Sequence, residues 1–225
     1  MSDSIKSTDL TFPQVDTNFE PVLGGFVKRG FDIAGALTGL IVLSPLFLLV
    51  ALLVRFSDGG SVLYGHRRIG RGGCTFQCLK FRTMVEDGDA VLASHFGANP
   101  EAKAEWDTTR KLKDDPRVTR VGAVLRKLSL DELPQIINIL QGHMSIVGPR
   151  PVVRDELENY GSAAVFYLRS RPGLTGLWQI SGRNDVSYDT RVAIDRHYVE
   201  NWSLALDLRI IIKTVPVVCL AKGSY

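Results

Sequence analysis

Residues 33–54 read IAGALTGLIVLSPLFLLVALLV, an apolar run of 22 residues that contains no charge. A continuous helix of this length would measure about 33 Å, which is enough to cross the hydrocarbon core of a bilayer. A buried helix of a soluble protein is the alternative, but a run so long and so uniformly apolar disfavours it. The stretch therefore predicts an element that lies within a membrane.

Two features of the run argue against a simple membrane span. Pro45, which follows Ser44, removes a backbone donor and clashes with the carbonyl group four residues earlier, so a helix should kink there. Both flanks are also basic, with Lys28 and Arg29 before the run, and the positive-inside rule places basic flanks in the cytoplasm. We therefore expect a re-entrant membrane helix hairpin over residues 28–57, broken at Ser44 and Pro45, with a single span as the alternative.

The chain as a whole has the composition of a folded protein. Of its 225 residues, 45% are hydrophobic and 23% are charged, which excludes a disordered or collagen-like chain. The net charge of +3 is too small to indicate a nucleic-acid-binding protein. This average combines a net charge of −3 over residues 1–27 with +6 over the remainder. We expect an acidic, disordered tail over residues 1–27 and a cytoplasmic domain with amphipathic membrane-surface helices over residues 58–225.

The three cysteines, Cys74, Cys78 and Cys219, are an odd number, so they cannot all pair within the chain. No second cysteine pair or histidine cluster completes a zinc site with them. Reduced thiols are the simplest interpretation, and they place the body of the protein in the cytoplasm. The N-terminus is acidic and is not typical of a signal peptide.

Local patterns predict a mostly helical α+β fold. Segments 61–66 and 75–83 alternate as short strands, and the glycine-rich stretch 70–73 between them favours a small β-hairpin. The apolar C-terminal segment 202–220 fits either an amphipathic helix in the membrane interface or a core helix. Further helices are predicted over residues 86–113, with an interruption at Asn99-Pro100, over residues 155–170 and over residues 188–201.

The most informative stretch, LRKLSLDELPQ, carries two adjacent carboxylates, Asp131 and Glu132. Ser129 and Glu132 have the spacing of a helix capping box, which would give Glu132 a structural role. Pro134 favours a helix that starts close to itself, which would leave both carboxylates just before the helix N-terminus. Carboxylates at that place, close to Arg126, suit a divalent cation, since Mg²⁺ is commonly held by one or two carboxylates plus substrate phosphates.

Several loops shaped by proline or glycine present cations. In GPRP, residues 148–151, two prolines fix the backbone around Arg150, and a rigid guanidinium suits bidentate binding of phosphate. A structural turn with a solvated arginine is the alternative. Together these loops fit a polyphosphate ligand, and the membrane segment suggests that a second substrate is a lipid. The other candidates are Lys80 and Arg82 in KFRT, and Arg183 and Asn184 in SGRN.

These segments resemble the bacterial sugar transferases, the polyprenyl-phosphate hexose-1-phosphate transferases with a monotopic catalytic core. The resemblance covers residues 28 to about 215 and is specific because several separate motifs agree. It implies the same re-entrant hairpin, attached to a cytoplasmic catalytic domain at the inner membrane of a bacterium. The matching segments are KRGFD (28–32), the Ser44-Pro45 break, KFRTM (80–84), DPRVTRVGAVLRKLSLDELPQ (115–135), GHMSIVGPRP (142–151) and RPGLTGLWQISGRN (171–184).

The family resemblance implies a phosphoglycosyl transferase that initiates exopolysaccharide biosynthesis. Asp131 would attack the β-phosphate of a UDP-hexose, release UMP and hold a covalent sugar phosphate, which undecaprenyl phosphate would then accept. Glu132, with Asp131, would hold Mg²⁺. Arg126 and Arg150 would bind phosphates, and Lys80, Arg82, Arg183 and Asn184 would line the site. The hexose, galactose or glucose, is not readable from these motifs.

Two other functions stay open from the residues alone. A Mg²⁺-dependent lipid pyrophosphate hydrolase would use water in place of the lipid acceptor. A non-catalytic membrane scaffold would bind anionic lipids or nucleotides through its arginines. The sequence also leaves the oligomeric state open, with a homodimer as one option.

Overall fold

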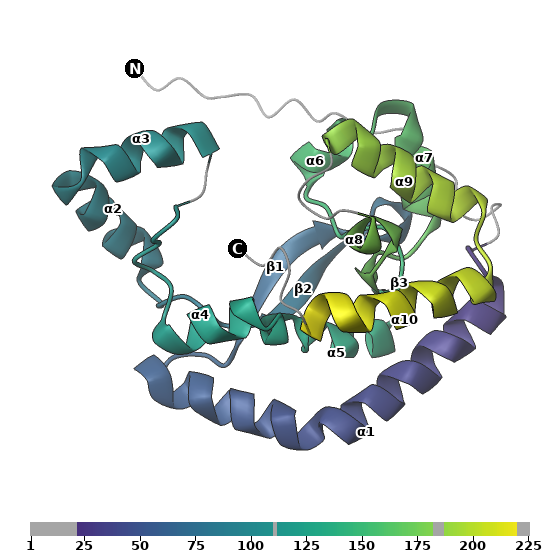
Figure 1. Ribbon diagram of the computed structural model, residues 1–225, viewed down its shortest axis with the longest axis horizontal. Coiled ribbons are helices and arrows are strands. Elements are labelled where there is room, and N and C mark those ends of the chain that lie inside the picture. The colour runs from purple at the N-terminus through teal and green to yellow at the C-terminus, as the bar shows by residue number, and fades with distance from the viewer. Residues whose placement is uncertain (1–21, 110–111, 182–186, 220–225) are drawn as a thin grey trace.

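The computed structural model describes residues 22–109, 112–181 and 187–219. A long helix comes first, then a β-hairpin, a helical hairpin and a series of shorter helices around a second small sheet (Figure 1). The elements are α1 (Gly25–Asp58), β1 (Leu63–Ile69), η1 (Arg71–Gly73), β2 (Thr75–Phe81), α2 (Gly88–Ala98), α3 (Pro100–Thr109), α4 (Arg120–Lys127), η2 (Leu130–Glu132), α5 (Gln135–Gln141), β3 (Ser145–Val147), α6 (Arg154–Glu158), η3 (Gly161–Ala163), α7 (Ala164–Arg169), β4 (Gly173–Thr175), α8 (Leu177–Ile180), α9 (Tyr188–Glu200) and α10 (Leu204–Cys219).

Helix α1 is one continuous helix of 34 residues, which corrects the expected break at Ser44 and Pro45. The helix does bend in its middle (Figure 1). The helix continues because a side-chain hydrogen bond replaces the backbone hydrogen bond that Pro45 cannot form. Pro45 has no N–H to donate to the carbonyl of Ile41, and the hydroxyl of Ser44 donates to that carbonyl instead, at 2.8 Å. The proline therefore bends α1 without leaving this acceptor unsatisfied.

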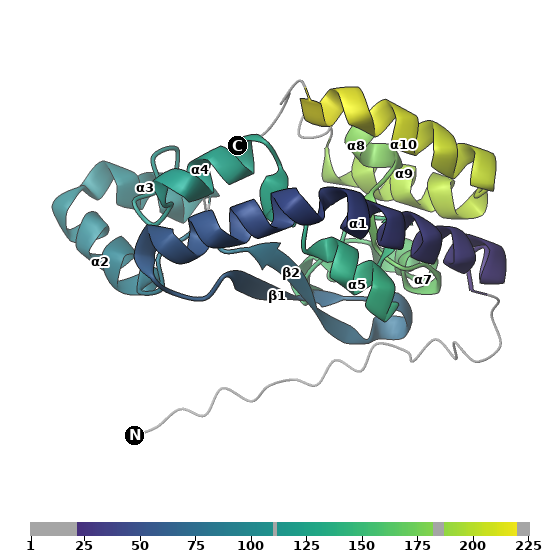
Figure 2. The ribbon, with the colours of Figure 1, turned by 90° about the horizontal axis from the view of Figure 1, so that it is seen from below.

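One face of α1 packs on the rest of the protein along both of its halves. Ala36 in the first half and Val50 and Val54 in the second are buried. The helix packs on α5 and β3 and on α4 and β2, and in Figure 2 it lies across the front of the molecule. It is also the one helix in the described residues that is long and apolar enough to cross a membrane. Its outward face exposes Phe26, Val27, Ile33, Leu37, Ile41, Val42, Leu48, Leu49, Leu52, Leu53 and Phe56.

The β-hairpin is confirmed, with β1 antiparallel to β2 and His66 opposite Cys78. Its glycine-rich loop forms the turn η1, in which Gly72 and Gly73 have φ of 68° and 81°, the left-handed region that favours glycine. A second sheet, which the sequence patterns missed, pairs β3 in parallel with β4. Each of its strands has only three residues, too few for a recognisable alternation.

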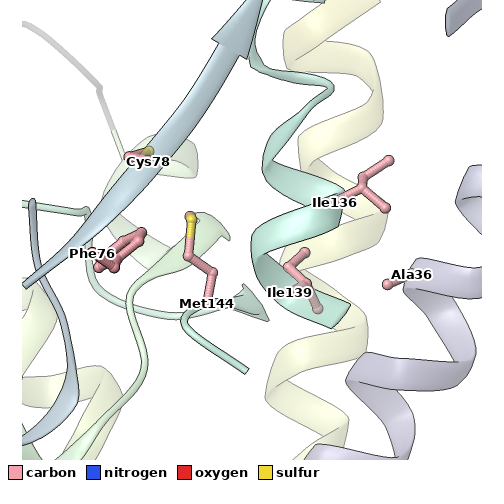
Figure 3. Close-up of a cluster of buried hydrophobic side chains, with 6 residues drawn as sticks. All are labelled: Ala36, Phe76, Cys78, Ile136, Ile139 and Met144. Atoms are coloured by element: carbon pink, nitrogen blue, oxygen red, sulfur yellow. The ribbon is translucent and has the colours of Figure 1, made fainter. Parts of the chain in front are cut away.

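Two hydrophobic clusters fix α1 on the domain. In the first, Ala36 of α1 faces Ile136 and Ile139 of α5, and Met144 and Phe76 complete the cluster on the β2 side of α5, as Figure 3 shows. In the second, the C-terminal half of α1 packs on Phe81 of β2 and on α4. Since α5 follows the Asp131–Glu132 pair and β2 carries Lys80, the packing of α1 also supports the two elements that form the site.

Polar side chains add a buried connection between α1 and α10. Lys28 of α1 forms an ion pair with Asp207 of α10 at 2.6 Å. The Asp207 carboxylate also accepts hydrogen bonds from the Tyr198 hydroxyl at 2.7 Å and from the indole N–H of Trp202 at 3.1 Å. Asp207 is 0% exposed and Lys28 4%. Both charges are therefore removed from solvent and depend on each other.

The remaining helix predictions were correct in part. The segment 86–113 contains a helical hairpin, α2 and α3, separated at Asn99 as expected, and Figure 1 shows this hairpin standing apart from the other helices. The helix expected over residues 155–170 is instead divided into α6, η3 and α7. Helix α10 packs on the core through Ile210, whereas Leu208, Ile212 and Val215 are exposed, so its place in a membrane interface stays a prediction.

Candidate active site

The turn η2 carries the two adjacent carboxylates. Asp131 is 8% exposed, and α5 begins only at Gln135, so the pair precedes this helix as predicted. Ser129 makes no side-chain capping bond, so the alternative role of Glu132 in a capping box is wrong. Ser129 has φ of 55°, in the left-handed region that a non-glycine residue rarely adopts. This conformation turns the chain from α4 into η2.

Lys80, near the end of β2, bridges the carboxylates. Its Nζ lies 2.7 Å from Oε1 of Glu132 and 3.5 Å from Oδ2 of Asp131. Burial acts to lower the pKa of Lys80, but the charges of Glu132 and Asp131 outweigh it and raise this pKa. Burial raises the pKa of Asp131, while Lys80 and Arg126 oppose the rise and Glu132 adds to it. The site therefore holds a poorly solvated carboxylate beside fixed positive charges.

Arg126, the last arginine of α4, is held in place next to this pair. Its Nε donates to the hydroxyl of Thr83 at 2.9 Å, and its charge acts on Asp131. The close approach of α4 to Thr83 requires a glycine, because a Cβ on Gly122 would lie 2.1 Å from the Thr83 carbonyl oxygen. The structure thus brings together Asp131, Glu132, Lys80 and Arg126, as the family resemblance implies.

Other predicted residues lie elsewhere. The guanidinium of Arg82 forms ion pairs with Asp58, at the end of α1, and with Glu86, so it fastens the helix to the hairpin. Arg150 lies over the ring of Trp178, with 5.6 Å from its Cζ to the ring centroid. Arg183 and Asn184 lie outside the described residues.

Arg150 belongs to a second cluster that the sequence patterns did not reveal. Its other members are Trp178 of α8 and Tyr188 and Arg191 of α9. Arg191 is separated from Arg150 by 41 positions and lies in no motif that singles it out. The signal that could have found it is its position in the helix that follows the SGRN segment. The guanidinium of Arg191 lies 4.5 Å from the centroid of the Trp178 ring.

One face of the β-hairpin contacts the two clusters. The side chains of Lys80 and Phe76 lie on the same side of β2, because side chains alternate between the two faces of a strand. Arg68 of β1 lies opposite Phe76. Arg68 forms an ion pair with Glu156 at 3.3 Å, and the backbone carbonyl of Glu156 accepts a hydrogen bond from the hydroxyl of Tyr188 at 2.6 Å. Lys80 and Phe76 are four residues apart in a strand, about 13 Å. Phe76 and Cys78, which lie between them on this face, are buried in the hydrophobic core, so the hairpin contacts both clusters without joining them by a continuous polar surface.

The donor atoms of the first cluster suit Mg²⁺ only together with substrate. No group of three or more His, Cys, Asp or Glu side chains that could hold a metal occurs in the described part of the chain. Two carboxylates with substrate phosphates are nevertheless an ordinary ligand set for Mg²⁺. Cys74 and Cys78 are both free thiols, as predicted, and burial raises the pKa of Cys78 to about 11, while Cys219 has no described side chain.

Comparison with known proteins gives consistent matches over most of the chain. The family described as "Bacterial sugar transferase" matches residues 23–221. The chain is 68% identical to the exopolysaccharide production protein ExoY of Sinorhizobium fredii, over 97% of this chain and 96% of that protein. It is 48% identical to the undecaprenyl-phosphate galactose phosphotransferase of Salmonella typhimurium, over 98% of this chain but only 46% of that protein. It is 38% identical to the UDP-glucose:undecaprenyl-phosphate glucose-1-phosphate transferase of Caulobacter vibrioides, over 88% of this chain and 72% of that protein.

Proposed function

The chain belongs to the bacterial sugar transferase family, and on this basis we propose that it transfers hexose 1-phosphate from a UDP-hexose to undecaprenyl phosphate, as the first step of exopolysaccharide synthesis. The observation that carries the proposal is the buried Asp131 carboxylate, next to Glu132 and within reach of the Lys80 and Arg126 cations. The family membership defines the protein as a transferase. The covalent mechanism described next is part of the proposal.

In the first step, a carboxylate oxygen of Asp131 attacks the β-phosphorus of the UDP-hexose. A new P–O bond forms, the bond from the β-phosphorus to the bridging oxygen breaks, and UMP leaves with that electron pair. In the second step, an oxygen of undecaprenyl phosphate attacks the same phosphorus. The bond to Asp131 breaks, the carboxylate is regenerated, and the hexose is left on a lipid diphosphate.

The neighbouring side chains support this chemistry through their charges. Lys80 already lies between the carboxylates, and it can offset negative charge on the transferring phosphoryl group. Arg126 is fixed by Thr83 through its Nε, which leaves the two terminal nitrogens of the guanidinium for a phosphate. Asp131 and Glu132 would hold Mg²⁺ together with substrate phosphates, and the ion would neutralise charge that develops in the transfer.

The packing of α1 supports attachment to one side of a membrane, and we propose that this side is the cytoplasmic face of the inner membrane. The same domain contacts both halves of α1, through Ala36 and through Val50 and Val54, so both ends of the helix belong on the side of that domain. The exposed side chains of α1, together with those of α10, are apolar and would be covered by lipid. A bent helix that dips into one leaflet fits this arrangement better than a span, which would separate the two ends.

Cysteine labelling tests this topology. In a background without Cys74 and Cys219, cysteines introduced at Gly30 and at Ser57 should both stay unlabelled by a membrane-impermeant maleimide in spheroplasts and react after permeabilisation. Gly30 is exposed, and a Cβ there meets nothing within 4 Å; Ser57 is exposed at the other end. Labelling of one position from the periplasmic side would overturn the one-sided arrangement.

A panel of UDP-hexoses tests the proposed reaction. The purified protein should release UMP and form a lipid-linked sugar phosphate when supplied with undecaprenyl phosphate in nanodiscs. We propose galactose as the hexose, because the relative named for galactose is 48% identical and the one named for glucose 38%. Higher turnover with UDP-glucose would overturn the choice of sugar. UMP release without a lipid-linked product would instead favour hydrolysis, and no release from any UDP-hexose would favour a scaffold.

A further inference from the structure

The second cluster places two guanidinium groups against one indole. Arg191 lies 4.5 Å and Arg150 5.6 Å from the ring centroid of Trp178, measured from each Cζ. Arg191 also lies 5.8 Å from the centroid of the Tyr188 ring. Trp178 is 8% exposed. The aromatic rings hold the guanidiniums in fixed planes and attract cations, but they do not neutralise the charges.

These two positive charges lack full compensation within the described residues. Neither guanidinium forms an ion pair with a carboxylate in this part of the chain, since no carboxylate oxygen lies within 4.0 Å of it. The carboxyl group of Asp195 interacts electrostatically with both arginines. It already accepts a hydrogen bond from the Tyr160 hydroxyl at 2.8 Å. Burial raises the pKa of Asp195 to about 7, although Tyr160, Arg191 and Arg150 oppose the rise. This one carboxyl therefore faces both arginines and the Tyr160 hydroxyl, and it cannot pair with both guanidiniums.

Two buried hydrogen-bond donors in the same cluster also find no acceptor among the residues that the structure describes. They are Nε of Arg191 and the indole N–H of Trp178. A buried donor without an acceptor is costly and rare in folded proteins, so such a group indicates that an acceptor is supplied from outside the chain. An anion with several acceptor oxygens would satisfy both donors and would neutralise both positive charges.

We propose that Arg191 is a phosphate-binding residue, which with Arg150 and Trp178 forms a subsite for a phosphate group of a substrate. The inference rests on the proposed function, because the phosphate groups in question belong to its two substrates, the nucleotide-sugar donor and the lipid acceptor. A planar guanidinium donates two parallel hydrogen bonds to phosphate, and the indole N–H adds a third donor. Among the described residues, no hydrogen bond, ion pair or ring contact joins Arg191 or Trp178 to Asp131, so we assign the subsite to holding a substrate phosphate and not to the reacting bond.

The test compares Arg191→Gln with the wild-type protein in nanodiscs. Loss of a charge-assisted hydrogen bond should raise the KM for one phosphate substrate roughly 10- to 100-fold. Since the residue does not touch the reacting atoms, kcat should change far less than KM. A rise in the KM for UDP-hexose assigns the subsite to the donor, and a rise for undecaprenyl phosphate assigns it to the acceptor. Unchanged KM values for both substrates would overturn the proposal.

Direct binding separates this inference from the proposed function. Binding of UMP and of inorganic pyrophosphate, measured by calorimetry, needs no turnover. If the wild-type protein transfers no sugar phosphate, the proposed function fails, while weaker binding of either probe by Arg191→Gln would still support an anion subsite. Equal binding of both probes by wild type and variant, together with unchanged KM values, would reject the subsite in an active enzyme.

A matched control lies on the same helix. Arg196 also stacks on an aromatic ring, that of Phe166 at 4.9 Å, but it has an ion-pair partner in Glu200 and lies outside the cluster. Arg196→Gln should therefore leave both KM values unchanged. Arg191→Lys keeps the charge but loses the planar pair of donors, so it should recover only part of the affinity. Thermal unfolding of each variant shows whether a KM change reflects misfolding, and a KM rise in Arg196→Gln equal to that in Arg191→Gln would contradict the proposal.

Discussion

Replacing Asp131 with asparagine should reduce UMP release from the UDP-hexose by roughly 10⁴-fold or more, the scale expected when a nucleophile is removed. An amide has nearly the size of the carboxylate but cannot form the acyl phosphate. Lys80 retains its contact with Glu132 at 2.7 Å, so the variant keeps a partner for the half-buried ammonium and should fold. The rate of UMP release in the absence and presence of undecaprenyl phosphate is the measurement.

Mass spectrometry of the intact protein gives an independent readout. Wild-type protein incubated with UDP-hexose alone should gain the mass of a hexose phosphate, and Asp131→Asn should gain none. Asp89→Asn is a suitable control, because Asp89 is an exposed acidic residue in the first turn of α2. This control should form the adduct as wild type does. An Asp131→Asn protein with wild-type turnover would disprove the covalent mechanism.

Replacing Asp207 with leucine should lower the free energy of unfolding by about 3–5 kcal/mol, because it removes the ion-pair partner of the buried Lys28 ammonium. Lys28 is 4% exposed, and its ion pair with Asp207 is 2.6 Å long. The Tyr198 hydroxyl and the Trp202 indole lose their acceptor in the same change. Denaturant unfolding in mild detergent, followed by circular dichroism, measures the loss.

Two further variants show whether the cost comes from the unpaired charge. The double variant Lys28→Met and Asp207→Leu removes both charges and should recover much of the lost stability. Glu200→Gln breaks the exposed ion pair with Arg196 on α9, and it should change the stability by less than about 1 kcal/mol. A single Asp207→Leu variant as stable as Glu200→Gln would show that the buried pair does not hold α1 on the domain.

The sequence predicted the features that depend on neighbouring residues. The glycines before Cys74 indicate the hairpin turn, Asn99-Pro100 separates α2 from α3, and Pro134 places the carboxylate pair before α5. The pair itself could be recognised because both residues stand side by side in one motif. The structure places Lys80 and Arg126 beside this pair, while their roles in one site, which the family resemblance implies, stay a prediction.

Features that depend on distant contacts were not predictable in this way. Lys28 and Asp207 are 179 positions apart, and nothing in either local pattern indicates that they meet. The strand β3 is too short to have a pattern, and its partner β4 lies beyond α7. The bend of α1 was predicted from Pro45, yet the helix continues because the Ser44 hydroxyl reaches one particular carbonyl. Side-chain geometry of this kind cannot be read from periodicity.

The attachment of α1 along its full length has a consequence for how an acceptor reaches the carboxylate. The packing clusters leave the helix little freedom to rock against the domain. With α1 in one leaflet, as we propose, its depth there would set the height of Asp131 above the lipid headgroups. A lipid phosphate that diffuses laterally could then meet the sugar phosphate at the headgroup level while its chain stays in hydrocarbon. Bilayer thickness and headgroup size would thereby become determinants of turnover, independently of any side chain in the site.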